Sequence, residues 1–276
     1  MLDLDACIDK VPIAFLDLET TGLRPEYGDR ICEVAILRCE GGEVVDALQQ
    51  LVNPQQPMSA GAYAVHGIGD EVLHEAPIFS EVARDLFALV EGAVLIGHNA
   101  PFDLGFLAQE MARLGNPMPS NVCLDTLRLA RVVYRLRSYS LGNLAASLGV
   151  NVGGRAHRAM VDVLLTKGVF ERLVRDLWSR EVRSVHDLIA AQGGPLAFPH
   201  LSDCVPPLIQ EALREKRLLH LRYLSDRGEE TERMVQPLGV WERGGNVFLI
   251  AHCFLRDARR TFRLDRILRM DIVQFD

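Results

Sequence analysis

The chain has 276 residues, of which 49% are hydrophobic and 24% are charged, and its formal net charge is −7. This composition is typical of a globular protein with room for two domains. The negative charge argues against a uniformly basic surface that binds nucleic acid indiscriminately, and no apolar run approaches the roughly 18 residues of a membrane span. No membrane partner is predicted.

The six cysteines form no C-x-x-C pair and no regular framework. They are interpreted as reduced thiols, as in a cytosolic protein. The first residues, MLDLDACIDKVP, lack the basic region and apolar run of a secretory signal. We therefore expect a cytoplasmic protein.

The first two thirds of the chain alternate strand and helix patterns. Residues 12–19 form an apolar run typical of a buried strand, and 31–39 and 43–52 predict two further strands joined at Gly41-Gly42. Periodicity and turn residues then predict a helix at 79–91, a strand at 93–98, a helix at 101–115, and helices at about 124–135, 140–148 and 157–178. This order predicts an α/β domain with a mixed sheet and flanking helices over residues 1–180.

A second, β-rich domain is predicted after a linker at 181–203. Gly193-Gly194-Pro195 and Pro199 interrupt both helix and strand patterns in that segment. Beyond it we expect a helix at about 205–217 and strands at 218–225, 233–242, 246–254, 261–267 and 270–275. Residues 204–276 are thus predicted to form a small curled β-barrel.

Two carboxylates stand at the end of the first predicted strand. Asp17 and Glu19 are two residues apart, so their side chains project from the same face of the strand. Two carboxylates in a dry site repel each other, and a divalent cation with its preference for oxygen ligands reverses that cost. Taken alone, the pair is more often only a strand end that meets solvent.

Further acids lie at the edges of other apolar elements. Asp103 falls in the first turn of a helix that directly follows a strand. Asp162 lies within the apolar run MVDVLL, where a carboxylate is costly unless something pairs with it. His157 lies five residues earlier, near the helix start, from where its ring can reach an adjoining site. Together these residues predict a site for divalent cations.

Three sequence blocks occur in the order D-x-E-T-T-G (17–22), H-N-A-x-F-D (98–103) and H-x-x-x-x-D (157–162). They resemble the DEDDh exonucleases, the DnaQ-like proofreading and RNase T group, over about residues 11–178. The resemblance implies a ribonuclease-H-like fold and stepwise 3′-to-5′ release of nucleoside monophosphates from DNA or RNA ends. It also implies two Mg²⁺ or Mn²⁺ ions. The implied metal ligands are Asp17, Glu19, Asp103 and Asp162, and the implied general base is His157.

An exonuclease must also hold a chain terminus. The segment expected to approach the last nucleotide consists of Thr20, Thr21, Gly22 and Leu23, where Gly22 permits close approach and Leu23 wedges against a base. Substrate contacts are also predicted for Asn99 and His66, although His66 is equally interpreted as capping a loop. His98 either orients Asp103 or packs locally. No base-reading pattern is evident, so we expect single strands to be bound with little sequence preference.

Arginines are frequent in the last part of the chain. A charge run is as often a solvated face as a phosphate-binding groove. The blocks over residues 204–276 resemble the WYL domain, although the tripeptide that names the family is Val247-Phe248-Leu249 here. The resemblance implies an Sm- or SH3-like barrel that binds nucleic acid or a nucleotide-like ligand. By that resemblance, the ligand candidates are Tyr223, Arg233, Arg263 and Arg266. Homodimerisation through this domain is equally compatible.

Three functions therefore compete. The first is a metal-dependent 3′–5′ exonuclease whose second domain holds single strands or senses a ligand. The second is a regulatory protein that senses nucleic acid or a ligand. The third is the proofreading subunit of a polymerase, although the sequence shows neither an attached polymerase nor a convincing clamp-binding peptide. The intact set of four acids and one histidine favours the first.

Overall fold

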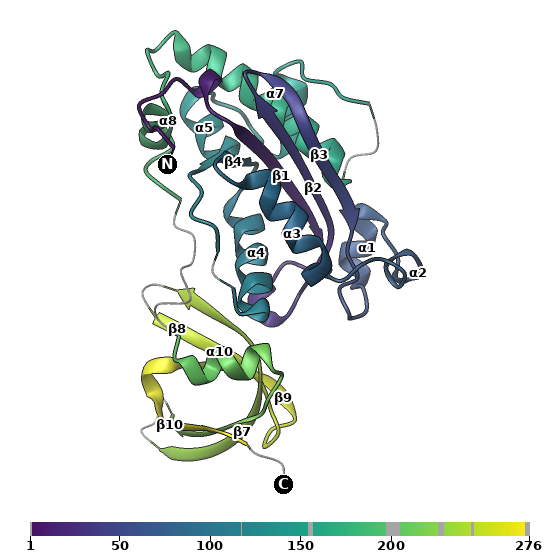
Figure 1. Cartoon of the computed structure of the whole chain (residues 1–276), viewed down its shortest axis with the longest axis vertical. Coiled ribbons are helices and arrows are strands. Elements are labelled where there is room, and N and C mark those ends of the chain that lie inside the picture. Colours follow the sequence, from purple (N-terminus) through teal and green to yellow (C-terminus); the bar gives the residue numbers. More distant parts are fainter. Residues whose placement is uncertain are drawn as a thin grey trace. The chain divides into compact units, whose positions relative to one another are not determined.

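A computed structural model describes residues 2–116, 118–153, 157–196, 205–225, 229–243 and 246–273 (Figure 1), and only the backbone of 241–243 and 246. The chain divides into two compact units. The first lies within Met1–Gly22, Ile31–Leu104 and Pro119–Leu196, and the second within Leu23–Arg30, Gly105–Met118 and Ala197–Asp276.

The first unit contains a five-stranded sheet with the order β3-β2-β1-β4-β5. Its strands are β1 (Ile13–Thr20), β2 (Ile31–Glu40), β3 (Glu43–Leu51), β4 (Val94–Gly97) and β5 (Cys123–Asp125). The pairs β1–β2 and β2–β3 are antiparallel, whereas β1–β4 and β4–β5 are parallel. The mixed sheet predicted from the order of elements is confirmed, and β1 is its central strand. The predicted hairpin turn is also present, with Gly41 and Gly42 both at positive φ.

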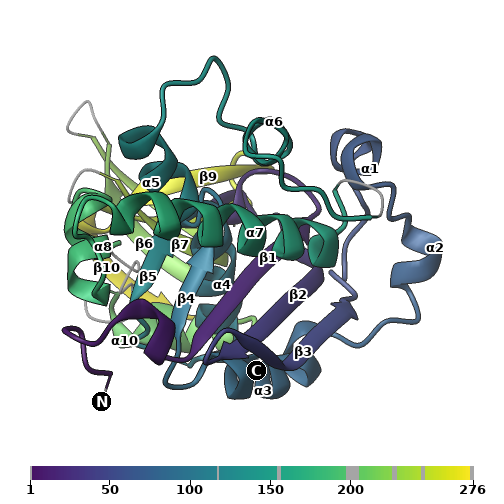
Figure 2. The ribbon, with the colours of Figure 1, turned by 90° about the horizontal axis from the view of Figure 1, so that it is seen from above.

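Helices cover both faces of this sheet. The helices before Leu196 are α1 (Ala60–His66), α2 (Asp70–Leu73), α3 (Phe79–Val90), α4 (Pro101–Leu114), α5 (Thr126–Val133), α6 (Leu141–Ser147), α7 (Ala159–Trp178) and α8 (Val185–Ala191), and α4 belongs to the second unit from Gly105 onward. Helix α7 packs across β1 and β2, and α3 packs against the same strands from the opposite face (Figure 2). No helix in the described ranges is both long and apolar enough to cross a membrane.

The helix predicted at about 124–135 begins later than expected. Residues 123–125 form β5, all buried, and helix α5 begins only at Thr126. Asp125 caps α5, because its side chain accepts a hydrogen bond from the Leu127 N–H. A strand of three residues is too short to show the alternation typical of a strand. The helical periodicity of the residues after it therefore led to the prediction of one helix.

The segment predicted as a linker contains helix α8. Ser184 and Asp187 form a capping box at its start. Val185 and Leu188 are buried in the core that α7 shares with the sheet. The residues up to Leu196 therefore belong to the first unit. Residues 197–204, which include the rest of the predicted linker and the predicted boundary, lie outside the described residues.

The second unit contains a five-stranded antiparallel sheet with the order β10-β6-β7-β8-β9. Its elements are α10 (Pro207–Arg214), β6 (Leu219–Leu224), β7 (Glu230–Arg243), β8 (Asn246–Cys253), β9 (Ala258–Arg263) and β10 (Ile267–Ile272). Helix α10 places Ile209 and Leu213 in a core shared with the strands. No pairing of β9 with β10 is recorded among the described residues, so a closed barrel stays a prediction.

The prediction of one continuous strand at 261–267 is wrong. Strand β9 ends at Arg263, and Leu264–Arg266 form a turn of 3-10 helix before β10 begins. The chain must turn here because β9 pairs with β8 whereas β10 pairs with β6. A period of two in the sequence does not report which neighbour a strand pairs with.

Candidate active site

Asp17 and Glu19 lie on the face of β1 that α7 covers. Phe15, one step earlier on that face, packs against Phe170 of α7 with 5.8 Å between the ring centroids. Strand β1 pairs with β4 only as far as Phe15. Both carboxylates therefore lie beyond the carboxyl end of β4, the kind of position at which α/β sheets open to bind ligands.

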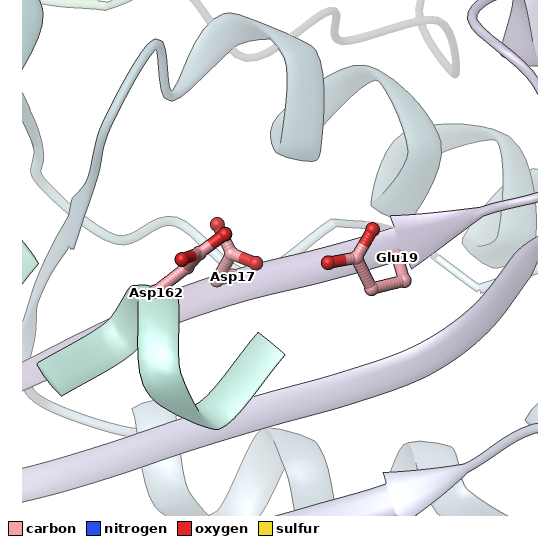
Figure 3. Close-up of side chains that lie close together, drawn as sticks. All are labelled: Asp17, Glu19 and Asp162. Carbon is pink, nitrogen blue, oxygen red and sulfur yellow. The ribbon is translucent and has the colours of Figure 1, made fainter. Parts of the chain in front are cut away.

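Helix α7 brings a third carboxylate to this pair. Asp162 lies in the first turn of α7, two turns before Phe170 on the same side of the helix. Figure 3 shows Asp162 next to Asp17, with the Glu19 carboxylate directed toward them from further along β1. Each residue has a carboxylate oxygen within 4.8 Å of an oxygen of each of the others. Three acids from two elements thus converge on one point.

A fourth acid, Asp103, lies against the backbone between the two acids of β1. It is 4% exposed, and its Oδ1 accepts a hydrogen bond from the Leu18 N–H at 3.1 Å. The short connection between β4 and α4 places it there, because Asp103 falls in the first turn of α4. The structure therefore brings together all four acids that the sequence predicted.

Burial, and to a smaller extent repulsion between the carboxylates, opposes the ionisation of the four acids. Burial, followed by the charges of Asp103, Asp162 and Glu19, raises the pKa of Asp17 well above its usual value. Burial and the charge of Asp162 raise the pKa of Glu19 to about 8, although Arg158 acts in the opposite direction. Burial is also the main cause of the raised pKa values of Asp103 and Asp162. A site that keeps four acids at such a cost fits divalent cations, whose charge offsets the repulsion and whose preferred ligands are oxygens.

His157 lies beside this cluster, immediately before the residue that caps α7. Its side chain is exposed, and its positive charge, when present, lowers the pKa of Asp162. Its backbone has φ = 60°, a left-handed conformation that is unusual outside glycine. The imidazole is thus near the acids and open to solvent, which is where a base that activates water is needed.

Sequence reasoning missed a fifth acid, Glu33 on β2. Its side chain is 1% exposed and forms an ion pair with Arg158, with 2.8 Å between Arg158 Nη2 and Glu33 Oε1. Glu33 lies directly opposite Glu19 in the pairing of β2 with β1. The available signal was a carboxylate inside the apolar run ICEVAIL, which is costly unless it is paired.

The segment after Glu19 is held in a tight turn. The Thr20 hydroxyl donates to the Gly22 carbonyl oxygen at 2.6 Å. Thr21 is 1% exposed, and its hydroxyl accepts a hydrogen bond from Gln56 at 2.7 Å. Leu23 is 79% exposed. A rigid turn followed by an uncovered apolar side chain suits the predicted contact with a terminal base.

His66 caps this turn from inside. It is 2% exposed, its Nδ1 accepts the Ile68 N–H at 3.0 Å, and its Nε2 lies 3.2 Å from the Thr20 carbonyl oxygen. The ring is therefore a neutral tautomer that donates from Nε2, and burial lowers its pKa. Of the two interpretations of His66, these contacts match the loop cap.

The β4–α4 connection depends on Asp125, another residue that sequence reasoning missed. Asn99 is exposed, has φ = 61°, and donates its backbone N–H to Asp125 Oδ1 at 2.8 Å. His98 contacts the Thr126 hydroxyl and the Tyr139 carbonyl oxygen, both at 2.9 Å. His98 therefore packs locally and does not orient Asp103 through these contacts.

The second unit has a pocket of about 250 Å³ that contains two of the four predicted ligand residues. Its lining consists of Tyr223, Ser225, Thr231, Arg233, Cys253, Arg256, Arg260, Thr261 and Phe262. Arg263 lies outside this lining, and its guanidinium pairs with Asp265 at 2.7 Å. Arg266 also lies outside it. Arg256 and Arg260, which belong to the arginine-rich last part of the sequence but not to the four ligand candidates, join Arg233 to make the pocket basic.

Four acids around the open end of a mixed sheet, with a histidine beside them, define a class of metal-dependent nucleases with a ribonuclease-H-like fold. The family model described as "Exonuclease" (RNase T) matches residues 14–170, and the WYL domain model matches residues 206–272. The chain belongs to the RNase T exonuclease family, and its exonuclease domain is followed by a WYL domain.

Several curated relatives are similar to the first part of the chain. A "DNA polymerase III subunit epsilon-like protein" of Rhodobacter capsulatus is 39% identical over 177 residues, which are 63% of this chain and 25% of the relative. The "3'-5' exonuclease DinG" of Bacillus subtilis is 30% identical over 62% of this chain and 18% of the relative. The chain thus spans a quarter or less of the length of these relatives.

Solved structures show the same fold. Exonuclease X in complex with 5′ overhanging duplex DNA is 25% identical with a TM-score of 0.52, covering 66% of this chain and 99% of that one. E. coli exonuclease I in complex with a dA16 oligonucleotide is 20% identical with a TM-score of 0.55, covering 88% and 55%. The ribonuclease-H-like fold of the first domain is thereby confirmed.

Proposed function

We propose that this chain is a metal-dependent 3′–5′ exonuclease that releases nucleoside monophosphates from single-stranded DNA or RNA ends. The observation that carries the proposal is the convergence of Asp17, Glu19 and Asp162 within 4.8 Å, with Asp103 behind them and His157 beside them. The names of the relatives, which include 3′–5′ exonucleases, support the direction of hydrolysis.

The four carboxylates would hold two divalent cations, Mg²⁺ or Mn²⁺. Such ions, when bound, polarise a phosphodiester, lower the pKa of a water molecule and stabilise the leaving oxygen. The carboxylates supply the hard oxygen ligands that such cations prefer. Without cations, the ionised carboxylates repel one another. Asp103 has an additional task, because its bond from Leu18 fixes the strand between the two other ligands.

His157 would accept the proton of the attacking water, since an imidazole is a base suited to neutral pH. The turn Thr20–Leu23 would receive the terminal nucleotide, with Leu23 against the base and the backbone near the sugar. Asn99, exposed at the start of α4, would contact the substrate nearby. His66 would act indirectly by keeping the turn in place.

The test follows hydrolysis of oligonucleotides labelled at either end. The expected result is mononucleotide release from the 3′ end in Mg²⁺ or Mn²⁺, loss of activity with a chelator, and loss in Asp17→Asn. DNA and RNA, single- and double-stranded, are compared in parallel. Activity that survives chelation, or full activity in Asp17→Asn, would contradict the proposal.

For the second domain, we propose a small Sm- or SH3-like barrel that binds nucleic acid or a nucleotide-like ligand in its basic pocket. Arg233 supports this, because its Nη1 is buried without a hydrogen-bond partner among the described residues. An anion or an acceptor from a ligand would satisfy this group. Tyr223 and Phe262, whose rings meet edge-on at 5.1 Å, add an aromatic wall. Arg263 and Arg266 stay ligand candidates outside the pocket.

Other roles of the whole protein are proposals as well. A boundary of the second domain at residue 204, a cytoplasmic location and homodimerisation through the second domain are predictions. A proofreading role is suggested by relatives named as DNA polymerase III proteins. A regulatory role would be favoured if removing the second domain abolished nucleic-acid binding while leaving hydrolysis unchanged.

A further inference from the structure

Glu33 binds the segment that carries the predicted base. One oxygen, Oε1, accepts hydrogen bonds from Arg158 Nη2 at 2.8 Å and from Gln49 Nε2 at 3.1 Å. The other, Oε2, accepts from Arg158 Nε at 3.1 Å and from the Ala159 N–H at 3.2 Å. The two bonds from Arg158 form a fork, which fixes direction as well as distance. Glu33 thus holds the two residues that directly follow His157.

Arg158 connects this pair to the metal-site helix. Its carbonyl oxygen accepts the N–H groups of Val161 and Asp162, at 2.8 and 3.1 Å. The first turn of α7, which presents Asp162 to the cluster, therefore starts on a residue whose side chain is bound to β2. A long α-helix has orphan N–H groups at this end, and Glu33 satisfies the one on Ala159.

His157 needs such support because its backbone has φ = 60°. A left-handed conformation costs free energy in a residue with a Cβ, and it persists only where the surroundings hold it. The side chain of His157 is exposed, so packing does not supply that hold, and its own backbone has a hydrogen bond to the Asp162 carboxylate. The bonds of Glu33 fix the next two residues, Arg158 and Ala159, on the other side of His157.

Electrostatics also stabilise the ion pair between Glu33 and Arg158. Burial alone would raise the pKa of Glu33, but the bonds from Arg158, Gln49 and the Ala159 N–H bring it below its usual value. The bond to Glu33 in turn raises the pKa of Arg158. The pair is therefore ionised at neutral pH.

We propose that Glu33 is a positioning residue of the exonuclease reaction. Through Arg158 and the Ala159 N–H, it holds His157 in its left-handed conformation beside Asp162. This rests on the proposed function of His157 as the base. No direct contact of Glu33 with substrate or cations is required.

The test is a double-mutant cycle between Glu33→Gln and His157→Ala. The substrate is the p-nitrophenyl ester of thymidine 5′-monophosphate, whose good leaving group keeps low rates measurable. In the otherwise unchanged enzyme we expect Glu33→Gln to lower kcat by about 10- to 100-fold, the size of effect seen for residues that orient a catalytic group from behind. KM should change less than about twofold. In the His157→Ala background, Glu33→Gln should cost nothing further. An equal loss in both backgrounds would overturn the proposal, because a merely structural role acts regardless of His157.

Hydrogen exchange gives a readout that does not depend on activity. In Glu33→Gln, the amides of Ala159, Val161 and Asp162 should exchange faster, whereas those in the rest of α7 should not. Unchanged exchange would overturn the proposal even if kcat fell. If Glu33→Gln does not fold, Arg158→Gln removes the same fork from the other side and gives the same expectations.

A matched control is Glu110→Gln. Glu110 is 2% exposed and is bound by Arg30 at 2.8 Å and by Arg113 at 3.0 Å, so it is an equally buried, paired carboxylate. Its substitution should leave exchange at 159–162 unchanged, and acceleration there would overturn the proposal. Full activity of His157→Ala would instead refute the base assignment, while the exchange experiment still decides whether Glu33 holds this segment.

Discussion

Asp103 Oδ1 accepts a hydrogen bond from the Leu18 N–H at 3.1 Å, and Leu18 is the residue between Asp17 and Glu19. A carboxylate of α4 is thereby tied to the strand that carries two other carboxylates. Asp103 thus has two separable roles, one as a negative charge in the cluster and one as an acceptor for a buried N–H.

Two substitutions separate these roles. Asp103→Asn keeps an acceptor oxygen but removes the charge, so we expect loss of metal-dependent hydrolysis by at least about 10²-fold with no loss of stability in chelator. Asp103→Ala leaves the Leu18 N–H unsatisfied, which should lower the free energy of unfolding by about 1–3 kcal/mol. Urea unfolding in chelator and a hydrolysis assay measure both. Equal stability of the two variants would show that the bond contributes nothing.

The sequence predicted this constellation well, because each acid interrupts an apolar pattern at a recognisable place. Asp17, Glu19, Asp103 and Asp162 were found in this way, and the mixed sheet followed from the order of elements. Glu33 also interrupts an apolar run, but the partners that give Glu33 and Asp125 their roles, Arg158 and Asn99, are more than 25 residues away in the chain. Pairing between distant residues leaves no periodic signal. The same limit hid the turn at 264–266, which follows from strand pairing.

The metal-free protein should lose stability as pH rises. Glu19 has a pKa of about 8 in the fold against an ordinary value of 4.5, because of burial and then the charges of Asp162 and Glu33. A raised pKa means that the stabilising protonated form is fully present below about pH 4.5 and is lost as pH rises through 8. In chelator, the melting temperature should therefore fall between pH 5 and pH 8.5.

The control for this pH dependence is Glu19→Gln, which should weaken it because one titrating group is removed. Mg²⁺ or Mn²⁺ should restore stability at high pH in the unsubstituted protein, since cations replace the protons. Differential scanning calorimetry across the pH range measures both effects. A melting temperature that is flat with pH in chelator would contradict the expected repulsion among the acids.

His66 offers a test of the turn that receives the terminal nucleotide. Replacing it with alanine leaves the Ile68 N–H and the Thr20 carbonyl oxygen without their buried partner, which should cost about 1–3 kcal/mol of stability. Because the turn then loosens, KM for oligonucleotides should rise more than kcat falls. Steady-state kinetics with urea unfolding distinguish this from a catalytic role, for which kcat alone would fall.

Low pH should also lower the stability of the fold through His66, because it protonates the ring. Burial lowers its pKa below 6.5, so the neutral ring stabilises the fold above that value, and stability is lost as pH falls below it. His66→Gln keeps an acceptor and a donor without the titration. Its stability should therefore be less sensitive to pH between 6.5 and 5 than that of the unsubstituted protein. An identical pH profile would exclude His66 as a contributor.

Arg233 should separate stability from binding in the second domain. Its Nη1 is buried without a hydrogen-bond partner in the described part of the chain. Replacing Arg233 with methionine removes an unsatisfied group and should raise the free energy of unfolding by about 1 kcal/mol. If the pocket binds phosphate, the same change should weaken oligonucleotide binding and reduce its dependence on salt by about one phosphate contact.

The matched control is Arg269→Met, because Arg269 is 73% exposed and already paired with Asp271 at 2.9 Å. Fluorescence anisotropy from 50 to 300 mM salt, in an Asp17→Asn background that prevents hydrolysis, compares the two. Equal losses in both variants would indicate a general effect of surface charge, and no loss in Arg233→Met would exclude the pocket as the phosphate site.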